Sequence, residues 1–168
     1  MYGRLICLLM FSRIVPTTPL VPVWSPNHRF LASTQVPQRL VTPEGGNYEL
    51  LLNGKLVYPS RRHRGFLSAY QDQHTFLSEL AWSPNSDRVA FVEKIYDWQY
   101  LDPYNGSFDG WATSMQYFLA IVSSRGEAKG YRLNQVPAHF SVRWLGPNRV
   151  ELNGLTFDLE ANPPQPIR

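Results

Sequence analysis

The sequence predicts an all-β protein, an antiparallel meander of blade-like four-stranded sheets, and three observations support this. The composition favours short strands joined by turns: of 168 residues, 14% are aromatic, 14 are proline and 11 are glycine. Two Asn-Gly pairs, each between apolar runs, are the strongest local signal for a hairpin. A phrase containing Trp occurs twice, and a reduced copy follows, which indicates a repeated unit. With a hydrophobic content of 43%, one domain with an ordinary core is expected over 1–168.

The repeated phrase organises the chain. Val-Trp-Ser-Pro-Asn at 23–27 returns as Ala-Trp-Ser-Pro-Asn at 81–85, and Arg-Trp-Leu-Gly-Pro-Asn follows at 143–148. The tryptophans are 58 and 62 residues apart. In each copy an extended segment ends at Trp, a turn containing Pro and Asn follows, and an apolar strand returns. We therefore expect three repeat units, the first of them degenerate, at about 16–70, 71–136 and 137–160.

The first residues allow several interpretations. The segment from Arg4 to Phe11 has the charge and the apolar run of a minimal signal peptide. However, the run is only seven residues long, Arg13 follows it, and the segment has no small-x-small cleavage site. A first β-strand, or a start codon assigned upstream of the domain, accounts for residues 1–15 equally well. No stretch reaches the ~18 apolar residues of a membrane-spanning helix, so we expect a soluble protein.

Alternation of apolar and polar residues predicts the strands. The second unit has four, in up-and-down order, at about 75–82, 88–94, 115–123 and 130–135. The two central strands are apolar on both faces, which is typical of strands inside a sheet. The strand at 130–135 is polar and resembles an edge strand.

Asn-Gly turns predict hairpins that close the first and third units. Asn53-Gly54 lies between Leu50 and Tyr58, and Asn153-Gly154 interrupts a clear alternation of apolar and polar residues. The tail at 161–168 contains three prolines, which cannot continue a sheet, so we expect it to be frayed.

The phrase at residues 82–91 resembles the Trp-Ser-Pro-Asp-Gly-x-x-apolar-Ala-Phe signature of TolB-type β-propeller repeats. Asn27 and Asn85 stand where that family has Asp, and neither is followed by Gly. The resemblance implies a partial or open β-propeller-like fold and an extracytoplasmic location, periplasmic or secreted. A propeller ring takes about 4–8 blades, and we expect material for fewer than three. Such a chain is a propeller fragment, oligomerises through its open sheet edges, or packs as an open pair of sheets.

An aromatic insertion separates the second and third strands of the middle unit. Residues 96–111 contain two Trp, three Tyr, one Phe and three Asp. Aromatic faces beside carboxylates and amides can stack on a sugar ring or a peptide and hydrogen-bond to it. Alternatively, the rings fold down as a lid over the ends of the sheets. The candidate ligand-binding or partner-binding residues are Trp98, Tyr100, Asp102, Tyr104, Asp109 and Trp111.

Charge suggests a second candidate site. Residues 1–70 carry a net charge of +6 and residues 71–168 a net charge of −3. Arg61, Arg62 and Arg64 form the densest cluster, which either binds a phosphate or carboxylate or is a solvated loop. The chain has three lysines, and no aromatic platform adjoins the cluster, so we expect no nucleic-acid binding.

The sequence gives little support for catalysis, metal or cofactors. Cys7 is the only cysteine, so there is neither an intramolecular disulfide nor a cysteine zinc site. Asp102, Asn105 and Asp109 are oxygen ligands, but they lack the spacing of a calcium loop. The four histidines are scattered, and we find no catalytic motif. We therefore expect no metal and no cofactor.

These observations favour a non-enzymatic binding or protein-interaction module with a protein or glycan partner. One alternative is a carbohydrate-active hydrolase or lyase that draws its acids from Asp97, Asp102 and Asp109. A carboxylate pair about 5–10 Å apart in an open groove would favour that enzyme. The other alternative is a structural or assembly subunit without a small-molecule site.

Overall fold

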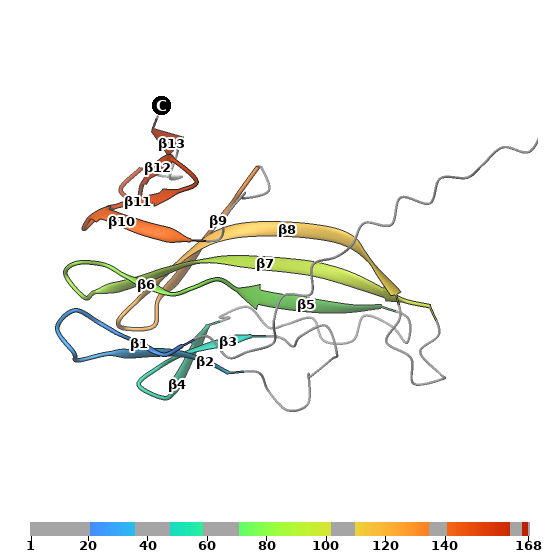
Figure 1. Cartoon of the computed structure of the whole chain (residues 1–168), viewed down its shortest axis with the longest axis horizontal. Helices are drawn as coiled ribbons and strands as arrows, with labels where there is room; N and C mark the ends of the chain where they lie inside the picture. Colours follow the sequence, from blue (N-terminus) through green and yellow to red (C-terminus); the bar gives the residue numbers. More distant parts are fainter. Residues whose placement is uncertain are drawn as a thin grey trace, which may run out of the picture.

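The computed structural model describes residues 21–35, 48–58, 71–101, 110–134, 141–161 and 166–167, and these form three antiparallel sheets (Figure 1). Sheet A contains β1 (Val23–Trp24), β2 (Leu31–Gln35), β3 (Glu49–Leu52) and β4 (Lys55–Tyr58). Sheet B contains β5 (Gln71–Leu77), β6 (Ala81–Trp82), β7 (Arg88–Tyr100), β8 (Gly110–Ser123) and β9 (Ala128–Arg132). Sheet C contains β10 (Val142–Gly146), β11 (Arg149–Leu152), β12 (Leu155–Asp158) and β13 (Pro166–Ile167). These ranges contain no helix, hence none that could cross a membrane.

The predicted all-β fold of blade-like sheets is confirmed. Sheets A and C are up-and-down meanders in sequence order, and sheet B has the order β5-β7-β8-β9, with β6 also paired to β7. The first unit, however, is not degenerate, because sheet A has four strands. The described residues form three sheets rather than fewer than three. Two polar residues at the end of β2, Thr34 and Gln35, obscure this strand in the sequence. Thr34 is nevertheless buried.

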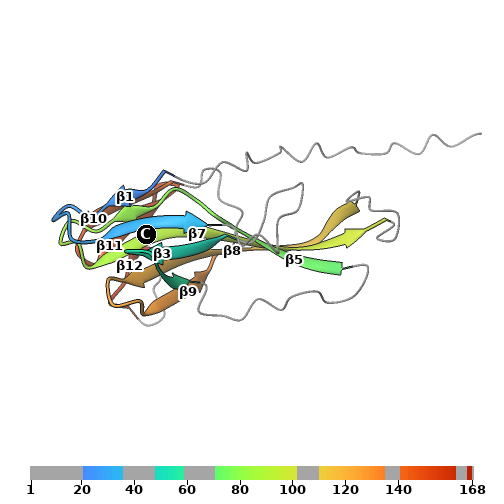
Figure 2. The same ribbon diagram turned by 90° about the horizontal axis from the view of Figure 1, so that it is seen from below.

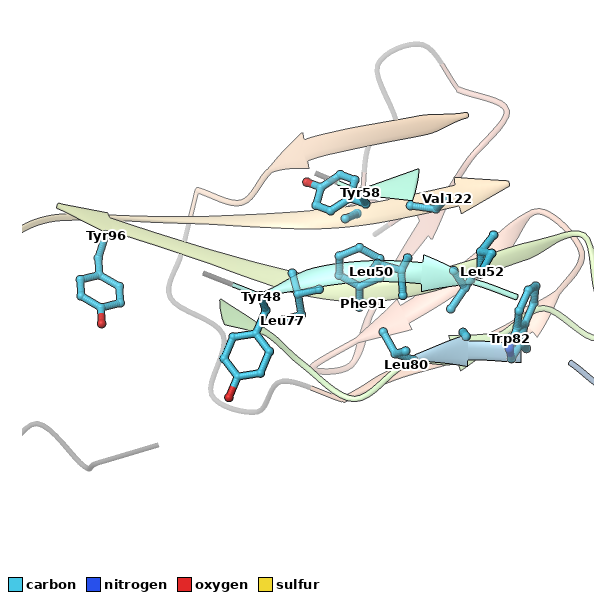
Figure 3. Packing of buried hydrophobic residues seen from close by; sticks show 13 residues of the cluster. Tyr48, Leu50, Leu52, Tyr58, Leu77, Leu80, Trp82, Phe91, Tyr96 and Val122 are labelled. Carbon is cyan, nitrogen blue, oxygen red and sulfur yellow. The ribbon is translucent and has the colours of Figure 1, made fainter. Parts of the chain in front are cut away.

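Sheet B lies between sheets A and C (Figures 1 and 2). Alternate residues of β7 therefore enter two different cores. Val89 and Phe91 pack with sheet A, whereas Ala90 and Val92 pack with sheet C. Figure 3 shows Phe91 in the first of these cores, together with Leu50 of β3. This arrangement confirms that β7 is an interior strand.

Neighbouring sheets approach each other at the strands that carry the repeated Trp. Strand β1 contacts β6, and β6 contacts β10. The Nε1–H of Trp82 donates to the carbonyl oxygen of Val23 at 2.9 Å. The Nε1–H of Trp144 donates to the carbonyl oxygen of Ala81, also at 2.9 Å. Because Val23 and Ala81 each precede the Trp of their own unit, both interfaces repeat one contact, which we call the tryptophan ladder.

The serine of the repeated phrase closes the turn that follows Trp. Ser25 and Ser83 are buried, with exposed fractions of 1% and 0%. Each side-chain oxygen accepts a hydrogen bond from the backbone N–H five residues later, of Phe30 and Arg88 respectively, at 3.0 Å. The third copy has Leu145 at this position, and its turn is one residue shorter, since Trp144 pairs with Val150.

Both Asn-Gly hairpins are present with the expected backbone. Asn53 and Gly54 have φ angles of 50° and 78°, and Asn153 and Gly154 have 54° and 76°. Positive φ at both central positions is the signature of a type I′ turn. Asn53 also joins its hairpin to β2, because its Oδ1 accepts from the N–H of Leu31 at 2.8 Å.

The strand at 75–82 and the tail both differ from the prediction. The strand expected at 75–82 is divided into β5 and β6 by an extra residue between Leu77 and Ala81, which leaves Val92 opposite a bulge. The hydroxyl of Ser78 accepts from the N–H of Val92 at 2.8 Å. In the tail, which we expected to be frayed, Pro166 pairs with Phe157 and Ile167 with Thr156. Proline is tolerated there because β13 is an edge strand.

Candidate functional site

The aromatic insertion extends two strands instead of forming a long loop. We expected these strands at 88–94 and 115–123, but β7 runs to Tyr100 and β8 starts at Gly110. Pairing continues outward to Tyr100 opposite Gly110. The reason is visible in the sequence: Tyr and Trp favour strands, and the residues that favour turns gather only from Asp102 onward. The loop predicted at 96–111 is therefore shorter than expected.

The extended strands form an arm that projects beyond sheets A and C (Figures 1 and 2). We define the arm as β5 with residues 95–101 and 110–116. Strand β5 supports it by pairing with β7 from Gln71 opposite Gln99 to Leu77 opposite Glu93. The described part of the insertion therefore runs away from sheets A and C and does not fold over them as a lid.

A bulge lies within the arm and fixes Asp97. The register between β7 and β8 shifts after Asp97, so that Trp98 pairs with Ala112 and Thr113 is the extra residue. The hydroxyl of Ser114 donates to Asp97 Oδ2 at 2.5 Å. The hydroxyl of Thr113 donates to the carbonyl oxygen of Asp97 at 3.4 Å. Asp97 thus accepts hydrogen bonds from both residues at the bulge, one through its carboxylate and one through its backbone carbonyl.

Two apolar side chains of the arm are exposed, and one of them pairs with a buried tyrosine. Leu101 is 64% exposed and Met115 is 54% exposed. Tyr96, which pairs with Met115, is buried, and Lys94 Nζ lies 5.1 Å from the centre of its ring. Burial lowers the pKa of Lys94. The arm therefore presents apolar groups to solvent on a well-packed base.

The structure brings some of the predicted binding residues together at the level of the backbone. Trp98, Tyr100 and Trp111 lie in the outer part of the arm, with Trp111 opposite Gln99. The side chains of these three residues are outside the described part of the structure. The predicted residues that lie wholly outside the described ranges are Asp102, Tyr104 and Asp109 of the insertion and Arg61, Arg62 and Arg64 of the arginine cluster.

Sequence reasoning missed a buried carboxylate between sheets A and B. Glu93 is 3% exposed and accepts a hydrogen bond from the hydroxyl of Tyr58 at 2.5 Å. The ring of Tyr58 packs edge-on against Phe91, with 5.2 Å between ring centroids. In the sequence, Glu93 directly follows the apolar residues 89–92 of a strand predicted to be interior. A charged residue at that position was the available signal of a buried carboxylate.

The described carboxylates of β7 do not form a glycosidase pair. Glu93 and Asp97 are four residues apart on an extended strand, which separates them by about 13 Å. Retaining and inverting glycosidases place their two carboxyl groups about 5–10 Å apart. Within the described ranges, no group of three or more His, Cys, Asp or Glu side chains could hold a metal ion.

A second candidate surface is the outer face of sheet A, which we define as Trp24, Leu31, Leu51 and Leu56. Trp24 pairs with Leu31, and Leu51 pairs with Leu56, so these side chains lie opposite to the core positions of the sheet. Trp24 is 53% exposed and Leu56 is 49% exposed.

The outer face of sheet C is charged, in contrast to that of sheet A. Arg143 pairs with Glu151 and forms an ion pair with it at 2.5 Å. Arg149 lies opposite Asp158 in the same sheet. The two ends of the three-sheet stack therefore differ in chemistry, one apolar and one charged.

Comparisons with protein-family models, with curated proteins and with solved structures found no match for this chain.

Proposed function

We propose that this protein is a non-enzymatic interaction module, built on TolB-type propeller blades, that binds a partner protein through its β5–β7–β8 arm. The observation that carries the proposal is the arm itself. The strands of the hairpins in sheets A and C are four residues long, whereas β7 and β8 have 13 and 14 residues. A ribbon of this length is not needed to build a four-stranded sheet.

The chemistry of the arm suits a protein partner. Leu101 and Met115 expose apolar surface at two separate places along the arm, where a partner protein can bury it. The sequence adds Trp98, Tyr100 and Trp111 to the same segment. Tyr and Trp are enriched among residues that dominate binding energy at protein interfaces. Strand β5 is also one of the two edges of sheet B among the described strands, and a sheet edge can receive an extended peptide as an additional strand.

Site-specific photocrosslinking tests this proposal. A photoreactive amino acid at Leu101 or Met115 should give a discrete protein adduct in the producing cells. The matched control positions are Arg125 and Glu160, which are exposed and polar and lie outside the arm; they should give none. Trp98→Ala with Trp111→Ala should abolish the adduct. Equal labelling at the control positions, or no adduct at either arm position, would contradict the proposal.

A glycan array separates the two partner classes. The purified protein should bind no glycan through the arm. Glycan binding that is lost in the Trp98→Ala, Trp111→Ala variant would replace the protein partner with a carbohydrate.

A further inference from the structure

The outer face of sheet A repeats the surface that sheets B and C bury. In sheet B, Trp82 and its pairing partner Val89 face sheet A, and both are buried. In sheet C, Trp144 and its partner Val150 face sheet B. Trp24 and Leu31 occupy the same positions in sheet A. No sheet precedes sheet A among the described residues, and Trp24 is 53% exposed where Trp82 is 9% exposed.

The tryptophan ladder defines what should contact Trp24. At both interfaces the Trp Nε1–H donates to the carbonyl oxygen of the residue that precedes the Trp of the neighbouring unit. In sheet C that residue is Arg143, on the edge strand β10. No sheet follows sheet C in the described ranges, so the ladder leaves one donor, Trp24, and one acceptor, the Arg143 carbonyl, at its two ends.

We propose that two copies of this chain pair with each other, sheet A of each copy on sheet C of the other. Trp24 Nε1 then donates to the carbonyl oxygen of Arg143 of the partner subunit. Two copies supply six sheets, within the range of about 4–8 blades in closed propellers. The pairing has two-fold symmetry, the commonest symmetry among soluble oligomers.

The shape of the stack supports closure. The strands that carry the repeated Trp lie next to one another: β6 contacts both β1 and β10, and β10 also contacts β7. When each sheet contacts the next through its Trp-bearing strand, these strands lie side by side. The sheets are then arranged around them as propeller blades are arranged around an axis. Continuation of the same contact from sheet A to a further sheet keeps that arrangement.

The side chains at the new contact are compatible with it. The side chain of Arg143 is 71% exposed, and a guanidinium can stack on the face of an indole such as Trp24. The interface between sheets A and B already buries polar groups, including Glu93 with Tyr58. A charged face on sheet C therefore does not prevent packing of this type. Pairing of two sheet A faces would bury apolar surface but would leave Trp24 without its acceptor.

Light scattering across a concentration series gives the molar mass and tests the proposal. The wild-type protein should have about twice the chain mass of 19.3 kDa. Trp24→Ala should be monomeric, and Trp24→Phe, which removes the N–H but keeps a ring, should weaken the dimer. Lys129→Ala, an exposed change on β9, is the matched control and should remain dimeric.

A second variant identifies the partner face. Thr156 pairs with Glu151 in the middle of sheet C, so Thr156→Arg adds bulk and charge to its outer face. This variant should be monomeric, with an unchanged circular dichroism spectrum. A mixture of the Trp24→Ala and Thr156→Arg proteins should regain dimer, because one intact contact forms in the mixed pair.

Three results would overturn the proposal: a monomeric wild type at all concentrations, a Trp24→Ala protein that dimerises like the wild type, or a Thr156→Arg protein that does so. The last result would assign the dimer to two sheet A faces. None of these results bears on the arm, because no arm residue takes part in the pairing.

Discussion

Trp82 donates its indole N–H to the carbonyl oxygen of Val23, 59 residues earlier in the chain, over 2.9 Å. The ring of Phe30 stacks on the indole, with 6.0 Å between ring centroids. One side chain thus joins sheets A and B both by packing and by a hydrogen bond. This double contact gives the repeated Trp its physical role, because the apolar ring is buried while its single polar group is satisfied.

Two substitutions of Trp82 should therefore distinguish the contribution of its packing to stability from that of its hydrogen bond. Trp82→Ala should lower the free energy of unfolding by about 3–5 kcal/mol, because it removes a large buried ring and leaves a cavity. Trp82→Phe keeps a ring and should lose less, with the lost hydrogen bond contributing about 0.5–1.5 kcal/mol. Urea denaturation measures both values. A loss below ~1 kcal/mol for the Ala variant would mean that the interface does not depend on Trp82.

The two Asn-Gly hairpins offer a second test. Asn53→Ala and Asn153→Ala should each be destabilising by about 1 kcal/mol or somewhat more, because Ala resists the positive φ that both positions have. Asn53→Gly permits that φ but removes the acceptor of the Leu31 N–H, so it should still be destabilising. The free energy of unfolding from urea titrations decides the matter. A neutral Asn53→Gly variant would show that the link to β2 contributes nothing.

Much of the fold could be predicted from the sequence, because its signals are local. The backbone at Asn53-Gly54 and at Asn153-Gly154 follows from residue type, and the interior position of β7 follows from apolar residues on both faces. The division of the strand at Ser78 was not predictable, since the bulge depends on how β5 and β6 register against β7. The pairing of Pro166 with Phe157 likewise requires a neighbouring strand that local sequence does not specify.

The site was harder to predict than the fold. We predicted a loop at 96–111 because its aromatic and acidic residues are typical of a binding site. Tyr and Trp also favour strands, and the structure has strands at both ends of this segment. The exposure of Trp24 could not be predicted, because the sequence around Trp24 closely matches the sequence around the buried Trp82. Only the order of the sheets shows that Trp82 has a sheet before it and Trp24 does not within the described ranges.

Stability should fall in alkaline solution. Burial raises the pKa of Tyr48, Tyr117 and Tyr131 above the ordinary 10.0, with the charge of Arg88 partly offsetting the effect at Tyr131. A raised pKa in the folded state gives a contribution to stability that is complete below pH 10.0 and is lost as the pH rises through the raised pKa. Burial lowers the pKa of Lys94 below 10.5, which acts in the opposite direction.

Because three tyrosines oppose one lysine, we expect the free energy of unfolding to fall as the pH rises above 10. Urea titrations at a series of pH values measure this, and phenolate absorbance shows which state ionises first. Tyr131→Phe should reduce the slope, since it removes one of the three groups. A stability that rises over this range would contradict the expected balance.

The turns after Trp24 and Trp82 provide a matched pair of variants. His28 and Ser86, at the position where the TolB-type signature has Gly, have φ angles of 55° and 63°. Left-handed backbone costs a residue other than Gly roughly 1–2 kcal/mol, and the entropy of Gly in the unfolded chain offsets about 0.5–1 kcal/mol of any gain. His28→Gly should therefore raise the free energy of unfolding by up to about 1 kcal/mol. His28 is exposed, and its ring lies against that of Trp24, at 6.5 Å between centroids.

Ser86→Gly should not bring the same gain. The hydroxyl of Ser86 is buried and accepts a hydrogen bond from the N–H of Asn27 at 3.0 Å, which links the turns of sheets A and B. Loss of this bond costs about 0.5–1.5 kcal/mol, enough to cancel the relief of the left-handed backbone. The two glycine variants should therefore differ by about 1 kcal/mol in urea denaturation, with His28→Gly the more stable. An equal gain in both would show that the hydrogen bond between the turns does not stabilise the contact of the two sheets.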